Sequence, residues 1–236
     1  MRALLVRVGA DVTKAGGGWN GPVNPKTGDF VYLPIPEICL QHQRMRRPYT
    51  LVRPALTRFG WELPPGLRQR MMHLDPDFAE LTYGDSNERA KQIGQKLRRG
   101  DLIVFYAGLR AVPRQRRLVY ALIGIFVVAS VRQAGEIPKR EWDRNAHTRR
   151  FPSPRKQDII VTGKPRLSGR LARCIPIGSF RRKAYRVAPN LIRRWGGLTV
   201  KDGYLQRSAR LPEFRDVGRF YTWFKKQGVR LLKHNH

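Results

Sequence analysis

The sequence predicts an α+β fold: a single domain over residues 1–236, built on a mixed, partly barrel-like β-sheet with flanking helices and long loops. The main observation is a pair of apolar runs at 101–106 and 118–131, which indicate two long buried strands. A capped helical pattern precedes them, and an amphipathic helix is predicted at about 216–232. A content of 41% hydrophobic and 10% aromatic residues is typical of a folded chain and excludes general disorder.

The first third of the chain reads as short strands and long loops. Residues 3–8 form a β-type run, and the glycine-rich segment 16–22 that follows is a loop. A second strand is predicted at 30–33, where Pro34 and Pro36 end it. Residues 39–67 are irregular and rich in arginine, proline and aromatic residues, so we expect a long surface segment without regular elements.

The central region carries the clearest signals. Ser86 or Asn87 begins a helix that continues to about Leu97, and Gly100 stops it. The next two strands are joined through a basic connection at 114–117.

Gly124 lies inside the second of these strands and predicts a bulge or a sharp bend, as barrels require. A helix over 138–147 and a strand over 158–161 come next.

The charge of the chain predicts its partner. With 47 Lys+Arg against 17 Asp+Glu, the net charge is +30, which favours a phosphate polymer over a small acidic substrate. Cys39 and Cys174 lie far apart and form no C-x-x-C pair, which fits a reducing compartment without a disulfide framework or a cysteine zinc site. The apolar run 118–131 is too short to span a bilayer and no cleavable signal precedes the first strand, so we expect a cytoplasmic protein with no membrane partner.

The densest expected phosphate footprint lies between Asp158 and Asp202, where no acidic residue occurs. Charge runs are commonly just solvated faces. This one is interleaved with Phe180, Tyr185 and Trp195, which favours nucleic-acid binding.

The sharpest candidate for chemistry is the segment 73–77. In extended conformation, His73, Asp75 and Asp77 would project from one face. Such a trio could bind a divalent cation, or pair a general base with its orienting acid, and we assign these three residues as candidate catalytic residues. The alternative is a turn in which the two carboxylates cap backbone groups and meet arginines. No other cofactor is identified.

The remaining candidates are nucleic-acid contacts. Segment 145–150 combines an amide, an imidazole and two guanidiniums that can hold a base edge and a phosphate, although a helix C-terminus explains them equally. Trp19, beside a glycine cluster that matches no phosphate loop, is a stacking surface for a flipped base. The full set of expected nucleic-acid contacts is Arg7, Asp11, Trp19, Asn20, Tyr106, Arg110, Asn145, His147, Arg149, Arg150, Arg181, Arg182, Lys183 and Arg207.

These segments resemble a known family. Residues 7–11 leading to Gly17-Gly18, the passage 22–36, the segment 73–77 and the entry 100–102 into the aromatic strand together resemble the nucleotide modification associated domain, type three, of bacteria and phages. The resemblance implies association with systems that install, process or sense modified DNA bases, but no established reaction. Residues 100–106 and 121–128 are also similar to the central hairpin of PUA-like barrels of the EVE and YTH type, which implies a PUA-like core at about 100–187.

Two readings of function follow. The leading one is a nucleic-acid-binding protein, for DNA rather than RNA, that recognises or processes a modified or flipped base in a base-modification or phage-defence system, with a pocket near Trp19, His73, Tyr106 and Asn145. The alternative is a base-modifying enzyme or glycosylase that uses His73, Asp75 and Asp77. A structural or ribosome-associated RNA binder is a third reading that charge alone allows. Protein partners and oligomeric state are not predicted.

Overall fold

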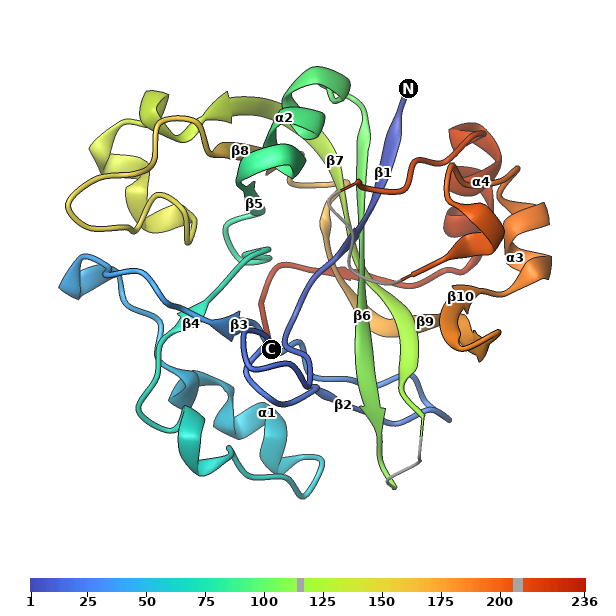
Figure 1. The fold of residues 1–236 in the computed structure, drawn as a ribbon, viewed down its shortest axis with the longest axis horizontal. Coiled ribbons are helices and arrows are strands. Elements are labelled where there is room, and N and C mark those ends of the chain that lie inside the picture. Colours follow the sequence, from blue (N-terminus) through green and yellow to red (C-terminus); the bar gives the residue numbers. More distant parts are fainter. Residues whose placement is uncertain (114–116, 206–209) are drawn as a thin grey trace.

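The structure is a computed structural model that describes residues 1–113, 117–205 and 210–236. Its strands are β1 (Ala3–Arg7), β2 (Pro22–Val23), β3 (Ile35–Pro36), β4 (Met72–His73), β5 (Thr82–Asp85), β6 (Leu102–Ala111), β7 (Val119–Gln133), β8 (Ile159–Gly163), β9 (Gly169–Arg181), β10 (Ala184–Val187) and β11 (Leu231–Leu232). Its α-helices are α1 (Arg53–Thr57), α2 (Asn87–Lys96), α3 (Pro189–Arg194) and α4 (Val217–Lys226). This mixture of a large sheet with helices confirms the predicted α+β class (Figure 1).

The sheet is organised around β7. One edge of β7 pairs with β6, while its other edge pairs first with β9 and then with β8. β1 joins β6 in parallel and β5 joins β8 in antiparallel orientation, so the sheet is mixed and runs in the order β1-β6-β7-β8-β5. Within the described residues β1 does not pair with β5, and barrel closure is therefore not confirmed.

The sheet has a hydrophobic core on each face because its central strands alternate between two apolar sets. In β6, Ile103 and Phe105 pack into the core formed with the first third of the chain, whereas Val104 and Tyr106 face the other core. That second core is closed by the helices α3 and α4, which lie together beside β9 and β10 in Figure 1. Burial on both faces explains the continuous apolar run of β7.

The bulge predicted at Gly124 is present. The β6–β7 register shifts between Phe105 and Tyr106, and the β7–β9 register shifts between Leu122 and Gly124. A Cβ at position 124 would lie 2.4 Å from Cε1 of Phe78, so the close approach of that ring requires glycine.

Several predicted elements differ from the structure. The strand expected at 30–33 is wrong: in that segment only Phe30 forms an isolated bridge, and the short β3 forms at 35–36, where Ile35 can pair with His73 at a two-stranded edge that tolerates proline. The helix expected over 138–147 is a 3₁₀ helix, Lys139–Arg144. The C-terminal helix ends at Lys226 and is followed by β11.

The basic segment between Asp158 and Asp202, which the sequence predicts as a phosphate-binding surface, forms regular structure. It contains β9, β10 and α3. The expected hairpin connection at 114–117 lies outside the described residues, apart from Arg117. Within the described ranges, no helix has the length and apolar character needed to cross a membrane.

Candidate functional site

A cavity of about 370 Å³ opens between the β3–β4 ladder, the end of β5 and the turn that follows the 3₁₀ helix Lys139–Arg144. Its lining includes the ionisable residues Arg7, Glu37, Cys39, His73, Asp75, Asp85, Arg89, His147, Arg150 and Arg155. The cavity therefore collects carboxylates and imidazoles in a chain that has only 17 acidic residues and five histidines.

The β3–β4 ladder fixes the first imidazole. His73 pairs with Ile35 in the register, which brings Glu37, just beyond β3, next to its ring. The His73 Nδ1 lies 2.8 Å from Glu37 Oε2, and the other carboxylate oxygen accepts the backbone N–H groups of Ile38 and Cys39. The imidazole is thus held by a carboxylate that is itself held by the backbone.

The second imidazole is fixed in the same way from the other side of the cavity. Nδ1 of His147 lies 2.6 Å from Oδ2 of Asp158, the residue that precedes β8. The same carboxylate oxygen accepts a hydrogen bond from Arg150. His147 and Asp158 are 4% and 1% exposed, so this arrangement is buried.

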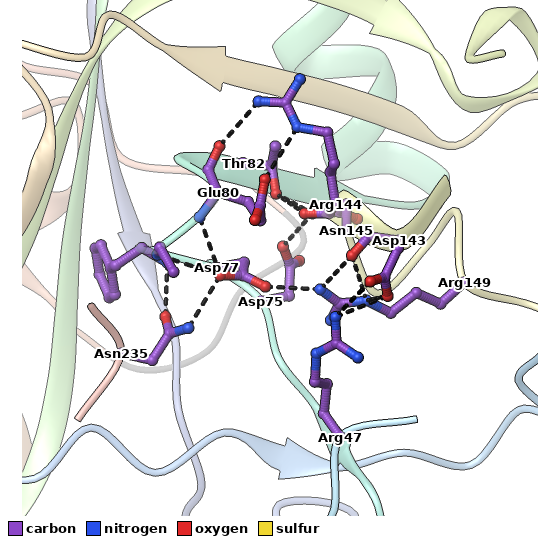
Figure 2. Close-up of polar contacts among 12 residues, drawn as sticks. Arg47, Asp75, Asp77, Glu80, Thr82, Asp143, Arg144, Asn145, Arg149 and Asn235 are labelled. Atoms are coloured by element: carbon purple, nitrogen blue, oxygen red, sulfur yellow. Dashed lines mark hydrogen bonds and ion pairs between the residues drawn. The ribbon is translucent and has the colours of Figure 1, made fainter. Parts of the chain in front are cut away.

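Asp75 lies beside the two rings. Its Oδ1 accepts hydrogen bonds from the backbone N–H of Gly84 at 2.7 Å and from the side-chain amide of Asn145 at 3.0 Å, a contact seen in Figure 2. Its Oδ2 lies 3.7 Å from Nε2 of His147. The two imidazole rings meet edge to face with centroids 5.0 Å apart. One donor atom from each of His73, Asp75 and His147 lies within 4.8 Å of the others, which is a metal-site geometry.

Gly84 makes this arrangement sterically feasible. A Cβ at that position would lie 2.4 Å from Cδ2 of His147 and 2.8 Å from Oδ1 of Asn145. Oδ1 of Asn145 in turn accepts the backbone N–H of His147 at 2.9 Å. The absent side chain on β5 therefore leaves the space in which the imidazole lies.

Burial shifts the pKa values of the carboxyl groups and of the imidazole in opposite directions. Burial raises the pKa of Asp75 to about 7. The charge of His73 and the hydrogen bonds that Asp75 accepts from Gly84 and Asn145 act in the opposite direction and lower this pKa. Burial lowers the pKa of His147 to about 4, so the ring is neutral at pH 7 although Asp158 favours its charged form. Burial also disfavours the charge of Glu37, but the hydrogen bond and charge of His73 outweigh it and lower the pKa of Glu37 to about 2.

Asp77 does not belong to this cluster, which corrects the expectation that it shares a face with His73 and Asp75. Its carboxylate accepts from Arg149 at 2.7 Å, from Asn235 at 2.9 Å and from the backbone N–H groups at 79 and 80 (Figure 2). The chain turns after Pro76 into a tight hairpin in which Asp77 and Thr82 exchange backbone hydrogen bonds. Asp77 thus has the turn-capping and arginine-pairing role of the alternative interpretation.

Many of the expected nucleic-acid contacts are not at the surface. The buried ones are Asp11, Asn20, Tyr106, Asn145, His147, Arg149 and Arg150, each at most 8% exposed. Arg149 is fully buried and donates to the Asp143 carbonyl as well as to Asp77, so it is a structural cation. Asn145 and His147 are instead part of the cavity cluster.

The expected base pocket is not assembled. Tyr106 donates a hydrogen bond to the carbonyl of Leu205 in the core on the opposite face of the sheet. Trp19 stacks on Trp61 with ring centroids 5.4 Å apart and does not line the cavity. The four residues predicted for one pocket therefore contribute only His73, as a lining residue, and Asn145, as its support.

The exposed expected contacts lie elsewhere. Arg182 and Lys183 form the exposed turn between β9 and β10, with φ angles of 48° and 60°. Arg181 and Arg182 both pair with Asp202. Arg110 is partly exposed, and Arg207 lies outside the described residues. Arg7 is also partly exposed, but unlike these residues it lines the cavity.

Sequence reasoning missed the carboxylates that hold the imidazoles. Glu37 is 36 positions from His73, and Asp158 is 11 positions from His147. Asp85 and Arg89, which pair at 3.1 Å on the cavity wall, were also missed. The only sequence signal for them is the scarcity of acids, which makes each remaining acid a candidate partner of a histidine or an arginine.

A model of one protein family matches most of the chain. The family is described as nucleotide modification associated domain 3, and the match covers residues 2–186, which include every cavity residue discussed above. Searches of curated proteins and of solved structures found no match. The similarity to PUA-like barrels stays a prediction.

Proposed function

The chain belongs to the nucleotide modification associated domain 3 family, and on this premise we propose that it binds DNA and acts chemically on a modified or flipped base in the cavity. The family supports a role associated with nucleotide modification. Within that role, the proposed activity is that of a base-modifying enzyme or a glycosylase, in a base-modification or phage-defence system.

The observation that carries this proposal is the pair of carboxylate-held imidazoles beside Asp75. Burying charged and polar groups costs free energy, and such clusters in a cavity with perturbed pKa values are typical of catalytic sites. A protein that only recognises a base needs hydrogen-bonding and stacking groups. It does not need His73 and His147 each held by its own carboxylate. The cluster therefore favours catalysis over recognition alone.

The rim of the cavity suits a nucleotide. Ile38 is 86% exposed and offers an apolar surface to a base, while the exposed Arg155 offers a cation to a phosphate. A volume of about 370 Å³ falls in the range of small-ligand cavities, roughly 300–1,000 Å³. The net charge of +30 supplies the sequence-independent attraction to a nucleic acid.

The test separates binding from chemistry. Purified protein is incubated with DNA and with tRNA that carry natural base modifications, with and without divalent cations, and nucleosides and released bases are analysed by mass spectrometry. Retention of each polymer is measured in parallel. We expect a released or altered base from DNA, and we expect His147→Gln to abolish the product while retention stays within about twofold of wild type.

Two outcomes would overturn the proposal. Selective retention of modified DNA without any chemical change, across all cations, would identify a reader of modified bases. Retention and chemistry on tRNA alone would identify RNA as the substrate.

A further inference from the structure

We propose that His73, Asp75 and His147 bind one divalent transition-metal ion whose open coordination positions face the cavity. Among the residues described, these three form the group of histidine, cysteine and acidic side chains whose donor atoms come close enough to hold an ion. They come from β4, the segment after it, and the turn after the 3₁₀ helix, so distant parts of the chain converge on one point.

The donor atoms need little movement to close on an ion. They lie within 4.8 Å of one another, and the His147 Nε2 and Asp75 Oδ2 are already 3.7 Å apart. Bonds of about 2.0–2.2 Å to nitrogen and oxygen require donor atoms roughly 3.0–3.5 Å apart. Side-chain shifts of about 1 Å are therefore sufficient.

The partners of the imidazoles are those of metal ligands. A ligating histidine characteristically donates its other ring N–H to a carboxylate, which fixes the tautomer and the ring orientation. Nδ1 of His73 and Nδ1 of His147 both have such partners, in Glu37 and Asp158. In each ring this leaves the lone pair of Nε2 available to bind the ion. On Asp75, Oδ1 is held by Gly84 and Asn145, which leaves Oδ2 for the ion.

The charge around the three donors also calls for a cation. The charged side chains around them that are each less than a quarter exposed are the carboxylates of Glu37, Asp75, Asp85 and Asp158 and the guanidiniums of Arg7, Arg89 and Arg150. The carboxylates thus outnumber the guanidiniums at this point of a protein that is otherwise strongly basic. A cation held by the three donors offsets part of the cost of burying these carboxylates.

The donor set indicates which metals fit. Two imidazoles and one carboxylate suit Zn²⁺, Fe²⁺, Co²⁺ or Mn²⁺, whereas Mg²⁺ and Ca²⁺ prefer all-oxygen sites. Three protein ligands leave room for water or substrate, and such an ion lowers the pKa of its bound water. Only the use of that water on a base rests on the proposed function, because metal binding itself needs no nucleic acid.

The experiment measures metal binding on untagged protein without nucleic acid. Zn²⁺ and Co²⁺ are titrated calorimetrically, the bound metal is counted by mass spectrometry after dialysis, and Co²⁺ absorption reports the ligand field. We expect one equivalent of Zn²⁺ or Co²⁺ and no binding of Mg²⁺ at equal concentration. We expect Asp75→Asn and His73→Gln to weaken Zn²⁺ binding at least 100-fold, and Glu37→Gln to weaken it about 10–100-fold.

Matched controls exclude simpler explanations. Asp85→Asn removes the same charge from the same cavity wall without removing a donor, and we expect its affinity to stay within about fivefold of wild type. The double variant His234→Gln/His236→Gln removes two other histidines and should leave stoichiometry and Co²⁺ spectrum unchanged. Circular dichroism of each variant tests whether it is folded.

Three results would overturn the metal site. These are wild type that binds no Zn²⁺ or Co²⁺, equal losses in Asp75→Asn and Asp85→Asn, and loss of binding only in the His234/His236 variant. A metal site that binds as expected in a protein that alters no base would leave this inference intact and contradict the proposed enzymatic function.

Discussion

Asp75 and Asp77 flank Pro76, yet their carboxylates belong to separate networks. Asp75 lies beside two imidazoles and accepts hydrogen bonds from Gly84 and Asn145. Asp77 accepts from Arg149 and Asn235. The two acids of one short motif thus have different roles, one in the cavity and one in the scaffold that places it.

The first prediction follows from the scaffold role of Asp77. Asp77→Ala removes the carboxylate 2.7 Å from the fully buried guanidinium of Arg149 and leaves it with the half-exposed carboxylate of Asp143 at 3.4 Å. Removing the partner of a buried charge destabilises a fold by about 3–5 kcal/mol, and the remaining pair with Asp143 reduces that cost. We expect urea denaturation to show a loss of up to this size and Zn²⁺ binding to persist wherever the variant is folded. The double variant Asp77→Ala/Arg149→Met should recover part of the loss. Wild-type stability together with lost metal binding would instead make Asp77 a site residue.

A second prediction concerns the space beside β5. Gly84→Ala places a Cβ 2.4 Å from the ring of His147 and should displace it. We expect Zn²⁺ affinity to fall at least tenfold. Gly94→Ala, within α2, is the matched control, because a Cβ at position 94 would lie at an ordinary van der Waals distance of 3.6 Å from Ile159. That change should raise stability by about 0.5–1 kcal/mol, since alanine favours helix over glycine. Equal affinities in the two variants would show that the close contact is relieved elsewhere.

The sequence predicted part of this site. His73 and Asp75 can be predicted as site residues from the sequence, because they are close in sequence and share a face near β4. The local pattern around His147 indicates a nucleic-acid contact, and nothing in it indicates Asp75 as a neighbour. Glu37 reaches His73 only through the β3–β4 pairing, and neither of these two-residue strands has a recognisable pattern of its own.

The fold was predictable where one strong local pattern dominates, as in β6, β7 and α2. β9 was not predicted, because cations at its less buried positions, such as Arg173, made the segment read as a charge run. Its buried apolar positions Leu171, Cys174 and Ile177 are spaced three residues apart, so β9 lacks the alternation by which a strand is recognised and is defined by its pairing with β7, β10 and β11.

A third prediction addresses the basic hairpin turn. Arg182 and Lys183 are exposed and have left-handed backbone conformations, which asparagine tolerates, so asparagine replaces them with little strain. We expect Arg182→Asn/Lys183→Asn to weaken binding to plain and modified DNA equally and to lower the slope of log affinity against log salt by about 1 for each lost phosphate contact. Lys91→Gln, an exposed lysine on α2 paired with Glu88, is the control. An unchanged slope in the double variant would place the phosphate contacts on another surface.

Thiol reactivity gives a fourth prediction. Cys174 is 5% exposed, and burial raises its pKa to about 12, so it is an un-ionised, inaccessible thiol at pH 8. Cys39 is half-buried and lines the cavity. We expect Ellman's reagent to titrate one thiol in the native protein and two in denaturant, with Cys39→Ser abolishing the native reaction. Native reaction of the Cys39→Ser variant would mean that the core around Cys174 opens.

The last prediction concerns pH and the segment after β11. His236 lies against the carbonyl of Tyr32, with Nδ1 3.1 Å from that oxygen. Burial lowers its pKa to about 4, assisted by Arg170 and His234 and opposed by the Tyr32 carbonyl and Asp77. The unfolded chain, with an ordinary histidine pKa near 6.5, therefore takes up a proton before the folded chain does. The stability associated with a neutral His236 is complete above pH 6.5 and is lost as the pH falls toward 4.

Comparison with His236→Gln isolates this contribution, because the other titrating groups are common to both proteins. We expect the unfolding free energy of wild type, measured by urea denaturation at pH 7.5, 5.5 and 4, to fall more steeply than that of the variant. The difference between the two should change by no more than about 3 kcal/mol, since solvent reaches part of the ring. Parallel curves would mean that His236 titrates normally and that its contact with Tyr32 is not maintained in solution.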